Sequence, residues 1–256
     1  MPTPRAAARE TLAILRVEAD PRKARALQAF FKEPVRAFGL STSRVRAIAS
    51  DLHREVKGSW TVGDAVELCD LLLARPELEA RGVAVLVLER FRNDYPESLF
   101  NKAHGWLAAN CMDNWASVDV FCPDVVGALL EMYPRLVRRI EAWAASPNRW
   151  VRRASIVSFI KLARRKEYRD AIYGMARRHF SSDDDLIQKA TGWLLREVGK
   201  QDMAVLEAFL VRHGPRIPRT TLRYAIERFP PGKRRDLLLA TRGARDMGRE
   251  HPCGER

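Results

Sequence analysis

The apolar residues of this chain recur with the spacing of helices. Between residues 185 and 200, for example, Ile187, Ala190, Leu194 and Val198 fall on one face when each residue turns the chain by about 100°. Runs that alternate apolar and polar residues are few, and no Asn-Gly hairpin turn occurs. The pattern therefore predicts an all-α protein.

Helix start and stop signals divide this pattern into short helices with short connections. Thr3-Pro4 and Asp20-Pro21 each place a capping side chain before a proline, as at helix N-termini. Ser41 and Thr61 are the expected caps of two further helices. Further helix breaks are expected at Pro34, Gly39, Gly58, Pro76, Pro96, Pro123, Pro134, Pro147, Ser182, Gly214 and Pro230.

A weak internal repeat accompanies the helices. A basic residue followed by small or apolar residues recurs at steps of about 35 residues, or twice that, at Arg46, Arg81, Arg153, Lys189 and Arg223. Such a period in a chain of helices indicates an α-solenoid of stacked helical hairpins. If each basic residue holds the same place in its hairpin, the solenoid presents a basic stripe on one face. The alternative is a chance spacing in an Arg-rich chain.

We expect residues 1–232 to form a single domain, because 256 residues with 46% hydrophobic content are sufficient for one large core. From Lys233 onward the chain is basic and polar, and it contains glycines after Leu239. Residues 233–256 are therefore predicted to be a tail outside the domain.

The chain is strongly basic. Lys and Arg outnumber Asp and Glu by 45 to 32, which gives a net charge of +13. The basic residues that run from Arg149 to Lys166 have no acidic residue among them. Because clustered positive charge binds phosphates by releasing counterions, this clustering favours nucleic acid as the partner over a merely Arg-rich, soluble surface.

The cysteines and the N-terminus argue against metal binding, secretion and membrane insertion. Cys69, Cys111, Cys122 and Cys253 form no CxxC pair and have no His at ligand spacing, so we expect no metal and no organic cofactor. The N-terminal stretch has no apolar segment long enough for a signal peptide or a membrane span. A monomer in the cytoplasm, associated with the nucleoid, is therefore expected.

Two residues near the middle of the chain could carry chemistry. Trp115 and Asp119 stand four residues apart, so on a helix they share one face with Val118 and Cys122. This is a poor setting for a merely solvated carboxylate. Asp119 therefore has either a structural role, as a cap or in an ion pair with an arginine, or a functional one.

A second candidate stretch begins at Asn148, which can cap a helix that carries Arg149, Arg152 and Arg153 in its first turns. The helical neighbours of Arg153 are apolar, so its guanidinium should be half-buried and needs an anion. That anion is either a carboxylate of the fold, with Asp119 as one possibility, or a phosphate at the helix N-terminus.

Trp193 lies at the edge of the apolar face of its helix, with Lys189, Arg196 and Lys200 clustered beside it. It either shields the helix seam under basic side chains or offers an aromatic plane among phosphate-binding charges. The remaining tryptophans are expected in the core, at Trp60, Trp106, Trp143 and Trp150.

Three segments give the chain a resemblance to a known family. NWASVD (114–119), SPNRWVRRASIVSFIKLARR (146–165) and LIQKATGWLLREVGK (186–200) come in the order and at the spacing of the AlkD family of DNA alkylation-repair glycosylases. The resemblance extends over residues 24–229. It implies an α-solenoid of HEAT-like repeats whose concave basic face binds duplex DNA.

The resemblance also implies roles for individual residues. Asp119 matches the catalytic aspartate, Trp115 and Trp193 match the site tryptophans, and Arg153 matches the arginine that contacts phosphate. Phe30 stands near the position of a DNA-facing tyrosine, where this chain departs from the family. Further DNA contacts are expected from the neighbouring basic residues Arg149, Arg152, Lys189, Arg196 and Lys200.

The activity implied is that of a DNA glycosylase in base excision repair. It would hydrolyse the N-glycosidic bond of positively charged alkylated purines, N3-alkyladenine and N7-alkylguanine, in double-stranded DNA. Two alternatives remain open. One is a non-catalytic α-solenoid that binds branched or distorted DNA, and the other is a helical-repeat scaffold for an acidic protein partner.

Overall fold

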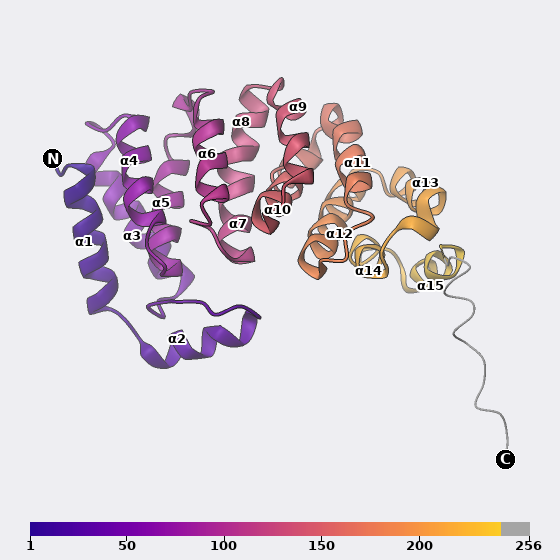
Figure 1. Cartoon of the computed structure of the whole chain (residues 1–256), viewed down its shortest axis with the longest axis horizontal. Helices are drawn as coiled ribbons and strands as arrows, with labels where there is room; N and C mark the ends of the chain where they lie inside the picture. The colour runs from indigo at the N-terminus through magenta and orange to yellow at the C-terminus, as the bar shows by residue number, and fades with distance from the viewer. Residues whose placement is uncertain (242–256) are drawn as a thin grey trace, which may run out of the picture. The chain divides into compact units, whose positions relative to one another are not determined.

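The computed structural model describes residues 1–241, which form helices and turns (Figure 1). The chain divides into two compact units, Met1–Leu136 and Val137–Arg256. No β-strand occurs among residues 1–241, where an isolated bridge joins Arg36 and Glu77. The prediction of an all-α fold is confirmed.

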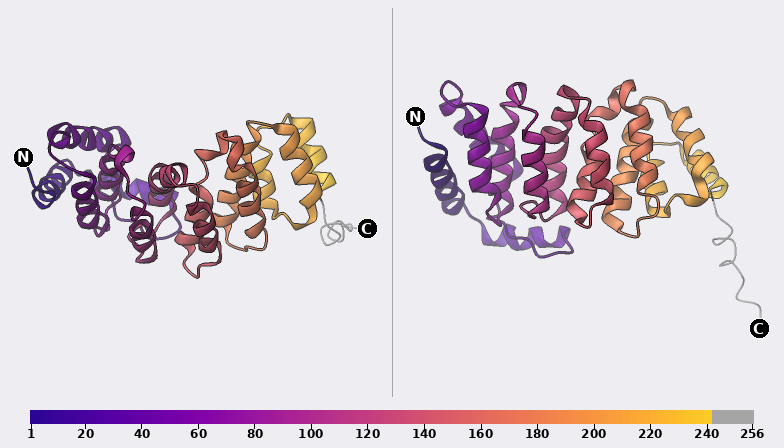
Figure 2. Two further views of the ribbon diagram at one scale, coloured as in Figure 1. Left: turned by 90° about the horizontal axis from the view of Figure 1, so that it is seen from above. Right: turned by 45° about the horizontal axis from the view of Figure 1, so that its top comes forward.

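The first unit contains the helices α1 (Pro4–Val17), α2 (Pro21–Leu27), α3 (Thr42–Val56), α4 (Val62–Leu73), α5 (Leu78–Glu89), α6 (Leu99–Ala108), α7 (Trp115–Phe121) and α8 (Gly127–Met132). Neighbouring helices pack side by side, with α4 against α1 and α5, and α3 against α5. The exception is α2, which lies across the ends of the packed helices in both Figure 1 and the right view of Figure 2.

The second unit contains the helices α9 (Leu136–Glu141), α10 (Arg149–Val157), α11 (Arg169–Arg178), α12 (Asp185–Gly199), α13 (Met203–His213), α14 (Arg219–Ala225) and α15 (Pro231–Ala240). The longest of them, α12, packs against α10, α11, α13 and α14. Its predicted apolar face, Ile187, Ala190, Leu194 and Val198, is buried. The candidate residues of α10 and α12 are therefore held by one continuous core.

Side-chain hydrogen bonds link residues that are one repeat apart. In the first unit, Trp106 Nε1 donates to Asp70 Oδ1 at 2.8 Å across 36 residues. In the second, Thr221 Oγ1 donates to the carbonyl of Gln188 at 3.0 Å across 33 residues. Stacked hairpins produce such contacts, because equivalent positions of successive hairpins lie next to each other. The predicted solenoid of helical repeats is confirmed.

The predicted basic stripe is wrong at two of its positions. Arg81 and Arg153 are each only 5% exposed. Arg81 Nε donates to the carbonyl of Arg75 at 2.7 Å, and Arg153 Nη1 donates to the carbonyl of Leu186. A buried guanidinium needs such acceptors, because an unpaired buried donor is costly. At these two positions of the repeat, the arginines are structural, because each donates a hydrogen bond to a main-chain carbonyl inside the fold.

The predicted N-terminal caps form. Thr3, Asp20 and Ser41 accept hydrogen bonds from main-chain N–H groups in the first turns of α1, α2 and α3. Thr61 forms a capping box with Asp64 at the start of α4. The boundaries of these helices therefore follow from local side-chain chemistry.

The predicted helix break at Pro123 is wrong. The chain continues from α7 to α8 through a π-helical turn, Cys122–Val126, in which the N–H of Gly127 donates to the carbonyl of Cys122. Proline has no N–H for the α-helical bond to residue 119, and widening the turn accommodates the ring. The irregular turn thus begins directly after the helix that carries Asp119.

The predicted tail is wrong for residues 233–240, which are part of a helix. Residues 231–240 form α15, which packs against α13, and Leu237 in its last turns is 2% exposed. Arg219 Nη2 donates to the carbonyl of Leu238 at 3.0 Å, which ties α15 to α14. The rest of the predicted tail, with Cys253, lies outside the described residues.

The tryptophans predicted to lie in the core, Trp60, Trp106, Trp143 and Trp150, are all less than 10% exposed. Cys69 and Cys122 are also buried, whereas Cys111 is partly exposed. Within residues 1–241, no three His, Cys, Asp or Glu side chains are grouped so that they could hold a metal ion. Helices in this part of the chain are too short or too polar to cross a membrane.

One buried histidine makes the stability of the second unit depend on pH. His179 is 2% exposed, and its Nε2 lies 3.0 Å from Ser155 Oγ. Burial, together with the charges of Arg152 and Arg178, lowers the pKa of His179 to about 4. The unfolded chain, with a histidine pKa near 6.5, therefore binds more protons than the folded chain between these values.

We expect the free energy of unfolding to decrease by up to about 3 kcal/mol from this group as the pH falls from about 7 to about 4. Urea unfolding at a series of pH values measures the decrease, and His179→Gln should flatten the profile across that interval. A His179→Gln profile as steep as that of the natural chain would contradict the assignment to His179.

Candidate functional site

Trp115 and Asp119 lie on the same face of α7, as predicted. The helix begins there because Asn114 Oδ1 accepts a hydrogen bond from the N–H of Ser117 at 2.9 Å, which makes Asn114 the N-cap. Trp115 and Asp119 are partly exposed, whereas Val118 between them is fully buried. The helix thus holds an indole and a carboxylate at the boundary between core and solvent.

The start of α7 is fixed by a buried arginine of α5. Arg81 Nη1 lies 2.5 Å from Asp113 Oδ1, and Asn114 Nδ2 donates to the same oxygen at 3.1 Å. Burial alone would raise the pKa of Asp113, but the hydrogen bonds from Arg81 and Asn114 hold it below its usual range. Because Asn114 is the cap of α7, this network determines where Trp115 enters the helix.

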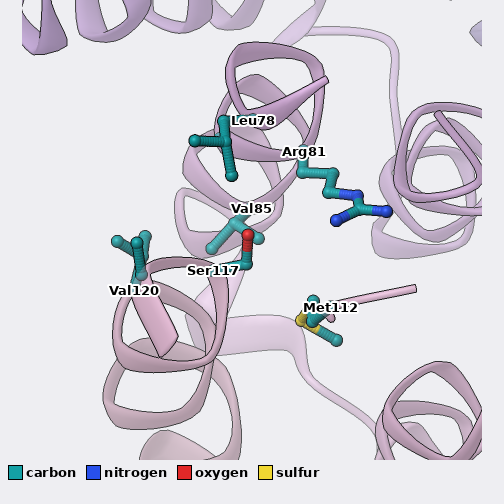
Figure 3. A pocket seen from close by; sticks show the side chains of 8 residues that line it. Leu78, Arg81, Val85, Met112, Ser117 and Val120 are labelled. Carbon is teal, nitrogen blue, oxygen red and sulfur yellow. The ribbon is translucent and has the colours of Figure 1, made fainter. Parts of the chain in front are cut away.

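A small pocket of about 120 Å³ is lined by residues of α5 and α7 (Figure 3). Its lining is mostly apolar, with Val85 on α5 and Val120 on α7 facing each other across it. The charged side chain at its edge, Arg81, is already bonded to Asp113 and to the carbonyl of Arg75. We therefore assign this pocket to the packing of α7 and not to a ligand.

A second pocket, of about 280 Å³, adjoins the Trp115 ring. Phe31 stacks on Trp115 with ring centroids 5.2 Å apart and 22° between the ring planes. Phe30, the neighbour of Phe31, also lines the pocket and is 73% exposed. Three aromatic side chains thus form one surface that runs from α7 to the segment after α2. In that segment, the sequence analysis had identified Phe30 but not Phe31.

On α10, the predicted cap Asn148 is confirmed: its Oδ1 accepts from the N–H of Trp150 at 2.8 Å. The basic residues of this helix have an acidic partner that the sequence analysis missed. Arg149 Nε donates to Asp184 Oδ2 at 2.6 Å, and Arg152 Nη2 lies 3.8 Å from the same oxygen. Asp184 is 35 residues from Arg149, so the repeat period of about 35 residues is the signal that could have identified it.

On α12, Trp193 is partly exposed and follows a close contact between helices. A Cβ added at Gly192 would lie 2.4 Å from Tyr224 Cβ and 2.5 Å from the carbonyl oxygen of Thr221. Only glycine lets α14 approach α12 so closely at this position. The edge of α12 that carries Trp193 is therefore fixed by the packing of α14.

The predicted DNA-binding cations of α12 are also paired with carboxylates. Lys189 Nζ lies 2.8 Å from Asp185, Lys200 Nζ lies 2.6 Å from Glu197, and Arg196 bonds to Glu227. Ion pairs at this level of exposure contribute only about 0–1 kcal/mol, so a phosphate could replace the carboxylate at small cost. Contacts of these residues with DNA remain a prediction.

The candidate residues fall in both units. Trp115 and Asp119 belong to the first unit, and Arg153 and Trp193 to the second. Trp115 and Trp193 are also the two tryptophans that are partly exposed, since the other four are buried. Large aromatic side chains usually lie in the core, so this exposure separates the two site candidates from the structural tryptophans.

The chain is similar to known proteins in sequence pattern and in fold. The family model of the DNA alkylation repair enzymes matches residues 11–229. In fold, the chain resembles a predicted DNA alkylation repair enzyme from Enterococcus faecalis, with a TM-score of 0.73 and 17% sequence identity, over 83% of this chain and 97% of that one. No curated protein matches the chain in sequence. With most of its length matched by the family model, the chain belongs to the DNA alkylation repair enzyme family.

Proposed function

We propose that this protein is a DNA glycosylase that removes positively charged alkylated purines, N3-alkyladenine and N7-alkylguanine, from double-stranded DNA. The observation that carries the proposal is the pairing on α7 of a partly exposed tryptophan, Trp115, with a partly exposed carboxylate one turn later, Asp119. Membership of a DNA alkylation repair family supports DNA as the partner.

The chemistry of this substrate class suits a site with one catalytic carboxylate. A purine alkylated at N3 or N7 carries positive charge, so it leaves the sugar as a neutral molecule and needs little general-acid help. The sugar that remains approaches an oxocarbenium ion, as in glycoside hydrolysis. Asp119 would stabilise that charge and orient the attacking water.

The two partly exposed tryptophans have a role in the same reaction. The face of an indole attracts a cation, with a contribution of about 0.5–2 kcal/mol that increases with desolvation. Each of the two indoles, Trp115 and Trp193, would therefore favour positive charge on the DNA that meets its face. Arg153, whose Nη1 bonds to the carbonyl of Leu186, would contact a phosphate of the DNA.

The purified protein is expected to release free methylated bases from duplex DNA that is methylated at N7 of guanine and N3 of adenine. No metal needs to be added, and EDTA should leave the rate unchanged, since each proposed role belongs to a side chain. Release is measured by chromatography of the free bases and by the number of abasic sites. Intact DNA binding with abasic sites at the spontaneous rate would identify a non-catalytic DNA-binding protein instead.

A further inference from the structure

The segment from Pro21 to Arg36, which we call the basic arm, carries a cluster of exposed positive charge in the first unit. It contains five basic residues and one acidic residue, Glu33. The basic side chains are all exposed: Arg22, Lys23, Arg25, Lys32 and Arg36. α2 forms its first half, and a 3-10 turn, Gln28–Phe30, follows directly.

Three of these cations differ from those of α10 and α12. Arg22, Arg25 and Arg36 form no ion pair with any carboxylate of residues 1–241, whereas Arg149, Lys189, Arg196 and Lys200 each have an acidic partner. An arginine without an internal partner keeps its full charge for an external anion and loses no existing contact when it binds.

The basic arm is held in one conformation at both ends. The N–H of Asp20 donates to the carbonyl of Phe38 at 2.8 Å, so the chain returns to the point where it left. Inside the arm, the side chain of Gln28 donates to the carbonyls of Phe31 and Glu33 and accepts from the N–H of Val35, at 3.0–3.2 Å. The charges are therefore carried by an ordered loop.

A carboxylate of α5 holds the segment in which the chain folds back after the arm. Glu79 is 6% exposed and accepts hydrogen bonds from the N–H groups of Phe38, Gly39 and Leu40 at 2.7–3.1 Å. Gly39 has a φ of +90°, and a Cβ there would lie 2.2 Å from the carbonyl oxygen of Asp20. Glycine and the buried carboxylate together fix the orientation of the arm on the first unit.

The arm reaches the candidate site directly. Phe31, near its middle, stacks on Trp115, and the exposed Phe30 extends the same aromatic surface. In Figure 1 and in the right view of Figure 2, α2 crosses the ends of the packed helices of the first unit. The arm thus places unpaired cations beside the face of α7 that carries Trp115 and Asp119.

We propose that the basic arm is a phosphate-binding element that holds the backbone of duplex DNA against the Trp115 face, with Arg22, Arg25 and Arg36 as its phosphate contacts. This proposal rests on the proposed function, because that function makes DNA the polyanion that the arm would bind. An anionic membrane is the less suitable partner, because α2 has only seven residues and its Leu27 lines the pocket beside Trp115.

The test compares two triple variants with the same loss of charge. Arg22→Gln/Arg25→Gln/Arg36→Gln neutralises the arm, and Arg212→Gln/Arg216→Gln/Arg228→Gln neutralises three exposed arginines of the second unit. Binding to an undamaged duplex is measured by fluorescence anisotropy over a range of salt concentrations. Thermal unfolding of both variants checks that the fold is retained, which is expected because the substituted side chains are exposed.

The arm variant should bind at least about tenfold more weakly at low salt, and the slope of log affinity against log salt should decrease by about 2–3, one unit per lost phosphate contact. The control should change the slope by less than about one. Equal losses in both variants, or an unchanged arm variant, would overturn the proposal. So would binding of the natural chain to anionic phospholipid vesicles in preference to the duplex.

Failure of this proposal can be distinguished from failure of the proposed function. The arm is tested by binding to undamaged DNA, and the glycosylase by release of methylated bases from the natural chain. A protein that binds DNA through the arm but releases no base would keep the arm assignment and overturn the glycosylase. If the natural chain releases methylated bases but the arm variant binds DNA as tightly as the natural chain, the glycosylase assignment stands and the arm assignment is wrong.

Discussion

Asp119→Asn is expected to reduce the rate of base release from methylated duplex DNA by about 10²-fold or more. The amide keeps the shape of the side chain but removes the negative charge that would stabilise the oxocarbenium-like sugar, and loss of one such electrostatic group has effects of this size. Affinity for DNA should be unchanged or higher, because a negative charge would be removed from the surface that we propose faces the DNA phosphates. Single-turnover kinetics and anisotropy measure the two quantities.

Asp51→Asn is a matched control for this prediction. Asp51 is an exposed aspartate of the same unit whose partner is Arg54 in the same helix, α3. The control should retain both rate and affinity. If Asp119→Asn instead lowers the thermal unfolding midpoint and the affinity along with the rate, Asp119 is a structural residue and its catalytic assignment is wrong.

Glu79→Ala is expected to destabilise the first unit by about 2–4 kcal/mol, because three N–H groups lose a charged acceptor and the group is buried. For a chain of this size, the thermal unfolding midpoint should fall by roughly 5–10 °C. The hydrogen bonds that hold the end of the basic arm on the first unit would be lost, so the affinity for undamaged duplex should fall as well. Scanning calorimetry and anisotropy give the two values.

Glu67→Ala serves as the control, since Glu67 is half-exposed and lies 3.7 Å from Arg5 at the surface of the same unit. Removing such a pair changes stability by about 1 kcal/mol at most. Tryptophan fluorescence provides a further readout, because Phe31 stacks on Trp115 and the arm carries Phe31. A Glu79→Ala protein that melts and binds like Glu67→Ala would show that Glu79 does not position the arm.

Much of the first-unit site could be read from the sequence because its determinants are local. Trp115 and Asp119 are four residues apart, and Asn114 supplies the cap that places both on one helical face. The contact between Phe31 and Trp115 could not be read in this way, because it spans more than 80 residues and depends on how the arm folds back. The same holds for the three N–H groups that converge on Glu79.

The arginines show most clearly how the charges expected from the sequence differ from those found in the structure. The sequence pattern predicts a basic stripe that includes Arg81 and Arg153, and it shows no acidic residue among the basic residues from Arg149 to Lys166. Asp113 and Asp184 lie close to a repeat period further along the chain and pair with Arg81 and Arg149. Local composition therefore overstated the positive charge of α10 and overlooked that of the basic arm.

By itself, the sequence determined the all-helical fold, the N-caps at Thr3, Asp20, Ser41 and Asn148, and the buried tryptophans. These depend on hydrogen bonds within a few residues and on apolar periodicity along one helix. Only the tertiary structure decided which cations remain unpaired and where the aromatic surface of Trp115 extends. Those properties depend on side chains brought together from distant hairpins, and the electrostatic and packing energies between them are set by distance in space and not along the chain.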